Sequence, residues 1–368
     1  MTGATEQDRQ GGPANRFASE GAKDALLAAF LFCCIAVATA RAKQPSGDWS
    51  FFVDAGRQLF SSAWRTVYID QPDAQTGPIT LALAKLLDPL GLAIVRLLLM
   101  LCALAFLGIV LMDTRGRRNV RWRLGIGGVV LALWWPQLSF FGHLDDAIVL
   151  VMAAATVALV RRDHRMRVAV LAGLAIAVKP TAVFMLAFTV PREHWRSLRS
   201  WVPTIVAAAI GGLFWAPFLI GTPGSLDAMK PRMNFLPGSV PALFGLEGEA
   251  PSGAYRAAQL ALVLGVAVFV AVRRGPAGVL LAATAARMLL DPAAWPYYAT
   301  GFVAAALLWE AYVHDNRVPW TTVSGGVLLA PESIVSSSTT RSMFRLIATG
   351  GALAATTFGD TLRRRVRR

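Results

Sequence analysis

Two aspartates lie six residues apart in the aromatic stretch SGDWSFFVDAGRQLF, residues 46–60. A carboxylate can act as a general base that removes the proton from an attacking hydroxyl group. Asp48 is the stronger candidate, because it lies close behind the first apolar run; its alternative role is to cap the helix that follows. Asp54 is a second catalytic candidate, and its alternative is an ion pair with Arg57 three residues later.

A lysine interrupts the apolar run LAGLAIAVKPTAVFML, residues 171–186. A charge inside such a run is costly and usually faces a polar cavity or a partner. Lys179 is therefore a candidate ligand for an anion such as a phosphate group, with Arg57 as a weaker candidate. The alternative is that the Lys179 amine extends to a membrane surface.

The segment GHLDDA, residues 142–147, places one histidine and two aspartates at an expected helix start. His143 can hydrogen-bond a phosphate or hydroxyl group, and Asp145 and Asp146 can bind an acceptor or cap the helix. These groups do not have the i, i+4 spacing of helical metal ligands, so no metal site is expected.

Aromatic residues recur in DPAAWPYY, residues 291–298, and beside Asp48. Trp49, Trp295, Tyr297 and Tyr298 are candidates for stacking against a sugar or acceptor. The alternative is that they form an ordinary aromatic belt at the membrane surface.

The composition indicates that membrane helices position these residues. The chain has 368 residues, of which 55% are hydrophobic and only 16% are charged, whereas soluble domains carry roughly 25% charged residues. We expect residues 1–23 to be a disordered cytoplasmic leader and residues 24–40 an uncleaved first span. A cleaved signal peptide is the alternative, and both place residue 41 onward outside.

Arginine clusters at 113–123, 161–167, 191–200, 273–274 and the C-terminus account for much of the formal charge of +14. They separate apolar runs, which is typical of cytoplasmic loops under the positive-inside rule. Topology therefore explains the charge, and a nucleic-acid partner is not expected. The same alternation places Asp48, His143 and Asp291 outside.

These patterns predict an all-α polytopic membrane bundle over residues 24–359, with about nine to eleven transmembrane or re-entrant helices, and a basic cytoplasmic tail at 360–368. Residues 78–87 are too short to cross the bilayer and are expected to be re-entrant or interfacial. Residues 168–190 are expected to form a broken helical hairpin at Lys179-Pro180. The sidedness after residue 314 stays open.

The sequence lacks both GxxxxGK[ST] and a strand-helix GxGxxG unit, so nucleotide chemistry is not expected. An enzyme acting outside on a polar molecule needs an activated donor that can cross the bilayer, such as a polyprenyl-phosphate sugar. The chain resembles the glycosyltransferases of family 87 in the order of four motifs, which are GDWSFFVDAGRQLF, FFGHLDDAIVLVMAAATVALVRR, LAGLAIAVKPTAVFML and LLDPAAWPYYATG. The resemblance covers roughly residues 25–313.

That resemblance implies a GT-C fold and a catalytic aspartate in the first outer loop, which corresponds to Asp48. It also implies transfer of mannose or arabinose from a polyprenyl-phosphate donor to a lipid-linked or cell-envelope glycan acceptor, at the outer face of the plasma membrane, without a cofactor. The chain departs from the family at Tyr297 and Tyr298, near which a histidine is common, and at TGPIT, where Tyr-x-Pro-Pro is common.

Two other classes of function remain. A transporter or flippase for a lipid or polar solute would use Lys179 and the broken helix as a binding site within the membrane. A catalytically inactive partner in envelope assembly would account for the departures from the family. One outward cavity that joins Asp48 with Lys179 favours the enzyme.

Overall fold

The computed structural model describes residues 13–41, 48–220, 222, 224–228, 233–330 and 334–366, and in these ranges it contains helices and no strand. Five segments are long and apolar enough to cross a membrane: Glu20–Ala40, Pro78–Asp113, Val120–Phe141, Leu198–Ile220 and Gly253–Arg273. The expectation of an all-α, multi-pass membrane protein is therefore confirmed.

The first half of the chain contains α1 (Pro13–Ala40), α2 (Asp48–Leu59), η2 (Trp64–Thr66), α3 (Val67–Asp70), α4 (Pro78–Leu87), η3 (Asp88–Leu90), α5 (Gly91–Asp113), α6 (Val120–Trp134), α7 (Pro136–Phe141), α8 (Leu144–Arg161), α9 (Arg165–Val178) and the 3-10 helix η4 (Pro180–Phe188). The second half contains α10 (Leu198–Ile220), α11 (Ser225–Ala228), η5 (Pro241–Phe244), α12 (Gly253–Arg273), η6 (Pro276–Gly278), α13 (Val279–Leu290), α14 (Pro296–Val313), α15 (Trp320–Leu329) and α16 (Ser338–Val366).

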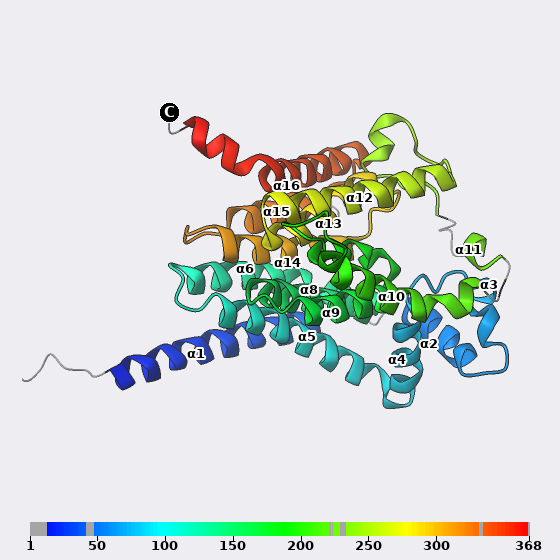
Figure 1. Cartoon of the computed structure of the whole chain (residues 1–368), viewed down its shortest axis with the longest axis horizontal. Coiled ribbons are helices and arrows are strands. Elements are labelled where there is room, and N and C mark those ends of the chain that lie inside the picture. The colour runs from blue at the N-terminus through cyan, green and yellow to red at the C-terminus, as the bar shows by residue number, and fades with distance from the viewer. Residues whose placement is uncertain are drawn as a thin grey trace, which may run out of the picture.

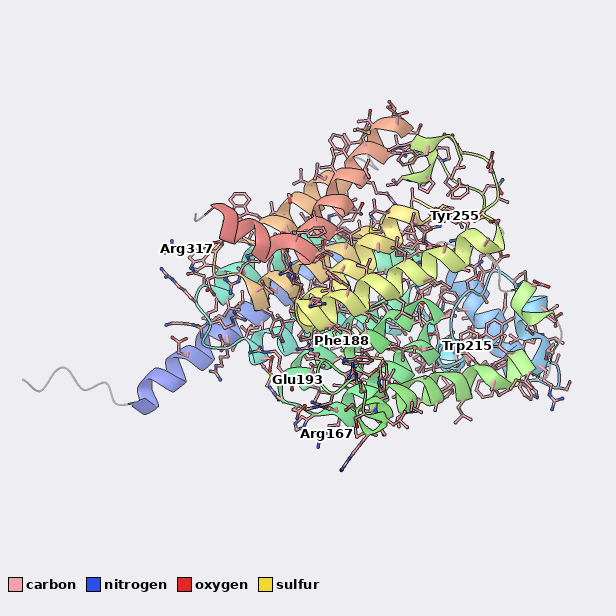
Figure 2. The ribbon with its side chains drawn as sticks, turned by 45° about the horizontal axis from the view of Figure 1, so that its top comes forward. Arg167, Phe188, Glu193, Trp215, Tyr255 and Arg317 are labelled. Atoms are coloured by element: carbon pink, nitrogen blue, oxygen red, sulfur yellow. The ribbon has the colours of Figure 1, made fainter. Side chains whose placement is uncertain are left out.

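The long helices run along the longest axis of the molecule, and α1 begins at the same end at which α16 stops (Figure 1). The basic loops meet at this end, which we call the basic end. Asp113 accepts from Arg161 and Arg162 at 2.9 and 3.0 Å, and Arg123 donates to the carbonyl of Asn316 at 3.0 Å. Figure 2 shows Arg317 at this end, far from Tyr255. The grouping agrees with the predicted alternation of sidedness.

Helix α14 lies in the core and is buried along nearly its whole length. Glycines on two neighbouring helices permit this packing, because a side chain there would overlap α14. A Cβ at Gly127 would lie 2.4 Å from Leu307, and one at Gly325 would lie 2.4 Å from Phe302. Small residues of this kind allow membrane helices to approach closely.

The predicted break at Lys179-Pro180 is present. Helix α9 ends at Val178, Lys179 is extended (φ −149°, ψ 122°), and the chain then returns as η4. Proline disfavours helical backbone in the residue before it and donates no backbone hydrogen bond. A pocket lined by both Val160 and Phe188 shows that η4 returns to the basic end. The expected broken hairpin is confirmed.

Segment 76–80 fixes the break in place. The carbonyl of Val178 accepts from the amide of Gly77 at 2.9 Å and from the hydroxyls of Thr80 and Thr76 at 2.7 and 3.3 Å. A Cβ at Gly77 would lie 2.0 Å from the carbonyl oxygen of Ala177. Only glycine permits this contact, which ties the start of α4 to the end of α9.

The N-terminal helix is longer than the sequence analysis expects. Helix α1 begins at Pro13, so residues 13–23 are helical where a disordered leader is expected; residues 1–12 of that leader lie outside the described residues. Arg121 accounts for part of this order, because it pairs with Asp24 at 2.6 Å and also with Glu20. At the other terminus, α16 continues through residues 360–366 of the expected tail.

Candidate functional site

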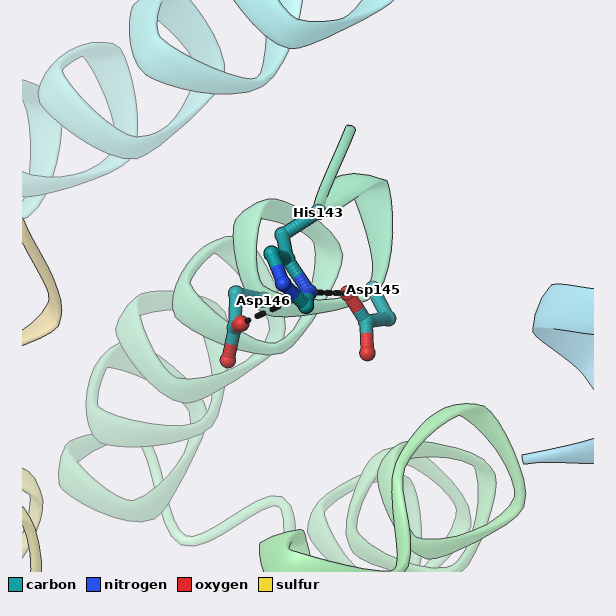
Figure 3. Close-up of side chains that lie close together, drawn as sticks. All are labelled: His143, Asp145 and Asp146. Atoms are coloured by element: carbon teal, nitrogen blue, oxygen red, sulfur yellow. Dashed lines mark hydrogen bonds and ion pairs between the residues drawn. The ribbon is translucent and has the colours of Figure 1, made fainter. Parts of the chain in front are cut away.

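Four charged or titratable side chains meet at the end of the bundle opposite the basic end, where α8 begins and α9 ends. The Lys179 amine lies 3.0 Å from Asp145 and 2.6 Å from Asp146, and the Nδ1 atom of His143 lies 3.2 and 3.5 Å from the same two carboxylates. Figure 3 shows His143 between the two aspartates. Lys179, His143 and Asp145 are each less than 10% exposed. We call these four residues the buried centre.

Local sequence explains how α8 presents these groups. Gly142 adopts φ +75°, a left-handed conformation that ends α7 and turns the chain into α8. His143 then precedes α8, and the two aspartates occupy its first turn. Carboxylates are stabilised there by the helix dipole. Thr76 donates a further hydrogen bond to Asp145 at 3.0 Å, which links the buried centre to the first loop.

Asp48, the first residue of α2, joins the buried centre through His143. Its Oδ2 atom lies 3.4 Å from the Nε2 atom of His143, and its side chain is 37% exposed. Asp48 and Lys179 therefore lie at the same end of the bundle, connected by His143 and the two aspartates. A partly exposed carboxylate beside a buried charged network is suited to contact a substrate.

The approach of α2 to α8 depends on the small size of Gly142. A Cβ at this position would lie 2.6 Å from the Cβ of Trp49, the neighbour of Asp48. We expect Gly142→Ala to displace Asp48 from His143 and to lower enzymatic activity by about tenfold or more, because small misplacements of catalytic groups are costly. The measurement is turnover by the purified variant.

Gly245→Ala is the matched control. Gly245 has φ +81° and ψ 12°, close to the φ +75° and ψ 21° of Gly142, but a Cβ there meets nothing within 4 Å. Both variants bear the cost of a left-handed alanine, about 1–2 kcal/mol, and only Gly142→Ala adds an overlap. Equal activity losses in the two variants would contradict the positioning role of Gly142.

Aromatic rings enclose His143. Tyr297 stacks on its imidazole with ring centroids 4.0 Å apart, and Phe52 contacts it edge-on at 5.7 Å. Trp295 contacts Phe141, which also packs against Tyr297. Tyr297 is one of the two tyrosines near which the family that the chain resembles commonly has a histidine. In this chain Tyr297 packs against the His143 ring and supplies no second histidine.

The pKa of His143 is set by opposing effects. Burial lowers it, but hydrogen bonding to Asp145 and Asp48 outweighs burial, so the pKa is raised above its ordinary value of 6.5. A raised pKa in the folded state means that protonated His143 stabilises the fold. This contribution is fully present below pH 6.5 and is lost as the pH rises through the raised pKa.

We therefore expect the thermal stability of the purified protein to decline as the pH rises above 6.5, and we expect His143→Gln to reduce this decline. Melting temperatures measured in detergent from pH 6 to pH 9 test the prediction. His164→Gln is the control, because His164 is exposed at the basic end. A decline of the same size in the His143→Gln variant would refute the assignment.

His143, Asp145 and Asp146 are also the described residues whose ligand atoms could hold a metal ion, since these atoms lie within 4.8 Å of one another. The Lys179 amine, however, already contacts both carboxylates. A divalent ion would have to displace this amine or lie beside its charge. The arrangement fits a lysine-neutralised pair of carboxylates better than a metal site.

Three other candidates have different surroundings. Asp54 and Arg57 lie 3.2 Å apart, and Arg57 also pairs with Asp88 at 2.8 Å, so they form an exposed ion-pair network at the end of α2. Trp49 is buried against Phe52 and Gly142. Their proposed roles in catalysis, phosphate binding and sugar binding stay predictions, while their contacts are those of structural residues.

Sequence reasoning missed two arginines. Arg287 on α13 lines a cavity together with Asp146, Lys179 and Tyr298. Arg256 on α12 lines the next cavity with Arg287. A signal was present for Arg287, because it interrupts the apolar run VLLAATAARMLL in the same way that Lys179 interrupts its own run.

The fold and the buried centre define a multi-pass membrane protein with a charged site at one end of its helical bundle. Residues 140–295 match a family model described as glycosyltransferase family 87. The match supports membership of the chain in this family, as the motifs indicate, and the family suggests a membrane glycosyltransferase. The matched range includes the buried centre, Arg256 and Arg287, but not Asp48. No curated protein and no solved structure matches the chain.

Proposed function

We propose that the protein transfers a sugar, mannose or arabinose, from a polyprenyl-phosphate donor to a lipid-linked or glycan acceptor on the extracytoplasmic side of the plasma membrane. The observation that carries the proposal is the contact between partly exposed Asp48 and buried His143, 3.4 Å apart. An acceptor can reach a base in this position, and His143 orients the base from the buried side. The adjoining cavity has charged and apolar walls, which suit a lipid phosphate.

The reaction is a direct displacement at the anomeric carbon. The Asp48 carboxylate takes the proton from the acceptor hydroxyl, and the hydroxyl oxygen forms the new bond to the anomeric carbon. The bond from that carbon to the phosphate oxygen breaks, and polyprenyl phosphate leaves with the electron pair. Attack opposite the leaving group inverts the anomeric configuration. Arg287, a cation that lines this cavity, stabilises the negative charge of the phosphate.

The buried centre supports this role for Asp48. His143 carries positive charge when protonated and attracts the Asp48 carboxylate, while Asp145 and Asp146 orient the His143 ring from the other side. Lys179 neutralises these two carboxylates and so lowers the energetic cost of burying them.

The test is an assay of the purified protein in lipid vesicles with radiolabelled decaprenyl-phosphate mannose and decaprenyl-phosphate arabinose, each offered lipid and glycan acceptors. Transfer of label to an acceptor, with the anomeric configuration inverted, supports the proposal. Movement of intact donor across the vesicle membrane without transfer would instead indicate a flippase. No transfer from either donor would contradict the sugars proposed here.

A further inference from the structure

Three neighbouring cavities at the site end share lining residues, and we call the three together the hollow. The first, about 70 Å³, is largely apolar and is lined by side chains that include Leu150, Phe184 and Val263. The second is about 100 Å³ and the third about 250 Å³. Thr181 lines all three cavities, which places it at the centre of the hollow.

Two arginines line the walls that neighbouring cavities of this hollow share. Arg287 lines the first and second cavities, and Arg256 lines the second and third. Gln75, from the first loop, lines the second and third cavities as well. An amphiphilic ligand with its chain in the first cavity would therefore present its head group to both arginines.

Arg256 is held in place without a bonded carboxylate among the described residues. Its Nη1 atom donates to Oε1 of Gln259 at 3.0 Å, and Gln259, which is 5% exposed, is itself fixed by donating to the carbonyl of Arg287 at 3.4 Å. The Nε atom of Arg256 is buried and has no hydrogen-bond partner in the part of the chain that the structure describes. A buried donor left this way is costly, and an anionic ligand would satisfy it.

Within the described part of the chain, Arg287 is bonded to one carboxylate. Its Nε atom lies 3.3 Å from Asp291, its guanidinium lies over the ring of Tyr298 at 4.6 Å, and its Nη1 atom contacts the hydroxyl of Thr181 at 3.5 Å. Among the described ion pairs, Asp291 is thus the one acid bonded to either arginine. Lys179, in contrast, is neutralised by two carboxylates.

We propose that Arg256 and Arg287, and not Lys179, bind the phosphate group of a prenyl-phosphate lipid whose chain occupies the apolar cavity. Two guanidinium groups present several donors in fixed directions and suit a phosphate better than one paired amine does. Gln259 positions Arg256. The assignment of this phosphate to the sugar donor rests on the proposed function. The binding of a phosphate in the hollow rests on the geometry of the two arginines alone.

The experiment measures the binding of farnesyl monophosphate to the purified full-length protein by intrinsic tryptophan fluorescence, with farnesol as the uncharged ligand. We expect Arg256→Gln and Arg287→Gln each to weaken binding of the phosphate by about tenfold or more, and to leave farnesol binding unchanged. Unchanged affinity for the phosphate in both variants would overturn the proposal.

Two further variants guard against loss of folding. Arg256→Lys keeps the charge but loses the forked donors, so we expect intermediate affinity at an unchanged melting temperature. Arg65→Gln is the matched control, because Arg65 is exposed in the first loop and rests on Trp64; its affinity should equal that of the unaltered protein. An equal loss in Arg65→Gln would mean that general surface charge, and not this site, binds the phosphate.

Phosphatidic acid serves as a second source of a lipid phosphate. Arginine-dependent binding of the prenyl phosphate alone assigns the site to the donor, and arginine-dependent binding of phosphatidic acid alone assigns it to an anionic acceptor lipid. If no sugar is transferred but binding still depends on Arg256, the proposed function fails and the phosphate site stands. If sugar is transferred but neither arginine affects phosphate affinity, only the phosphate site fails.

Discussion

Asp48→Asn is expected to reduce glycosyl transfer by about 10²–10⁴-fold while the protein still inserts and folds. The amide cannot accept the proton of the acceptor hydroxyl, and general bases contribute this much to the rate. The substitution preserves the size of the side chain, and the side chain is partly exposed, so stability should change little. Transfer is measured on the purified variant in vesicles with saturating donor and acceptor.

Asp73→Asn provides the matched control, because Asp73 is also an exposed aspartate at the site end, in the loop that follows α3. We expect it to retain full transfer. If Asp48→Asn also kept full activity, the base would have to be another group of the site. An unchanged pH profile in a weakly active Asp48→Asn variant would likewise argue against proton removal by this residue.

Lys179→Met is expected to have the largest effect on stability. It removes the amine that lies 3.0 and 2.6 Å from two aspartates and leaves these carboxylates without that charge in a buried place. Removing one partner of a buried ion pair costs about 3–5 kcal/mol. The measurement is the melting temperature of the detergent-solubilised protein, together with its half-life at a fixed temperature.

A double-mutant cycle tests whether the ion pair itself is the cause. Asp146→Asn in the Lys179→Met background removes one of the uncompensated charges, so the double variant should be more stable than the sum of the two single effects predicts. Strict additivity would show that Lys179 stabilises the protein through contacts other than the pair with Asp146.

The structure also changes how the candidate residues divide into roles. Asp48, His143, Asp145, Asp146 and Lys179 all stand out in the sequence, and the fold brings them into one connected network. Lys179 is expected to bind a phosphate, but its amine is already paired with two carboxylates. Arg256 and Arg287 lie beside it in the hollow with less neutralising charge.

The sequence alone determined the membrane class and the irregular points of the bundle. Long apolar runs require helices in a bilayer, since backbone groups must bond within the segment. Pro180 requires a break after α9, and arginine clusters mark one end of the molecule. Each of these features follows from residues close together in the chain, so each could be predicted without knowing the tertiary contacts.

Only the tertiary structure decided which charges neutralise one another. Asp48 and His143 are 95 residues apart in the sequence, and Lys179, which directly follows α9, contacts Asp146 on α8. Arg256 and Arg287 line the same cavity because α12 packs on α13. A charged side chain in an apolar run signals that a partner or ligand exists, but which partner it meets depends on how the helices pack.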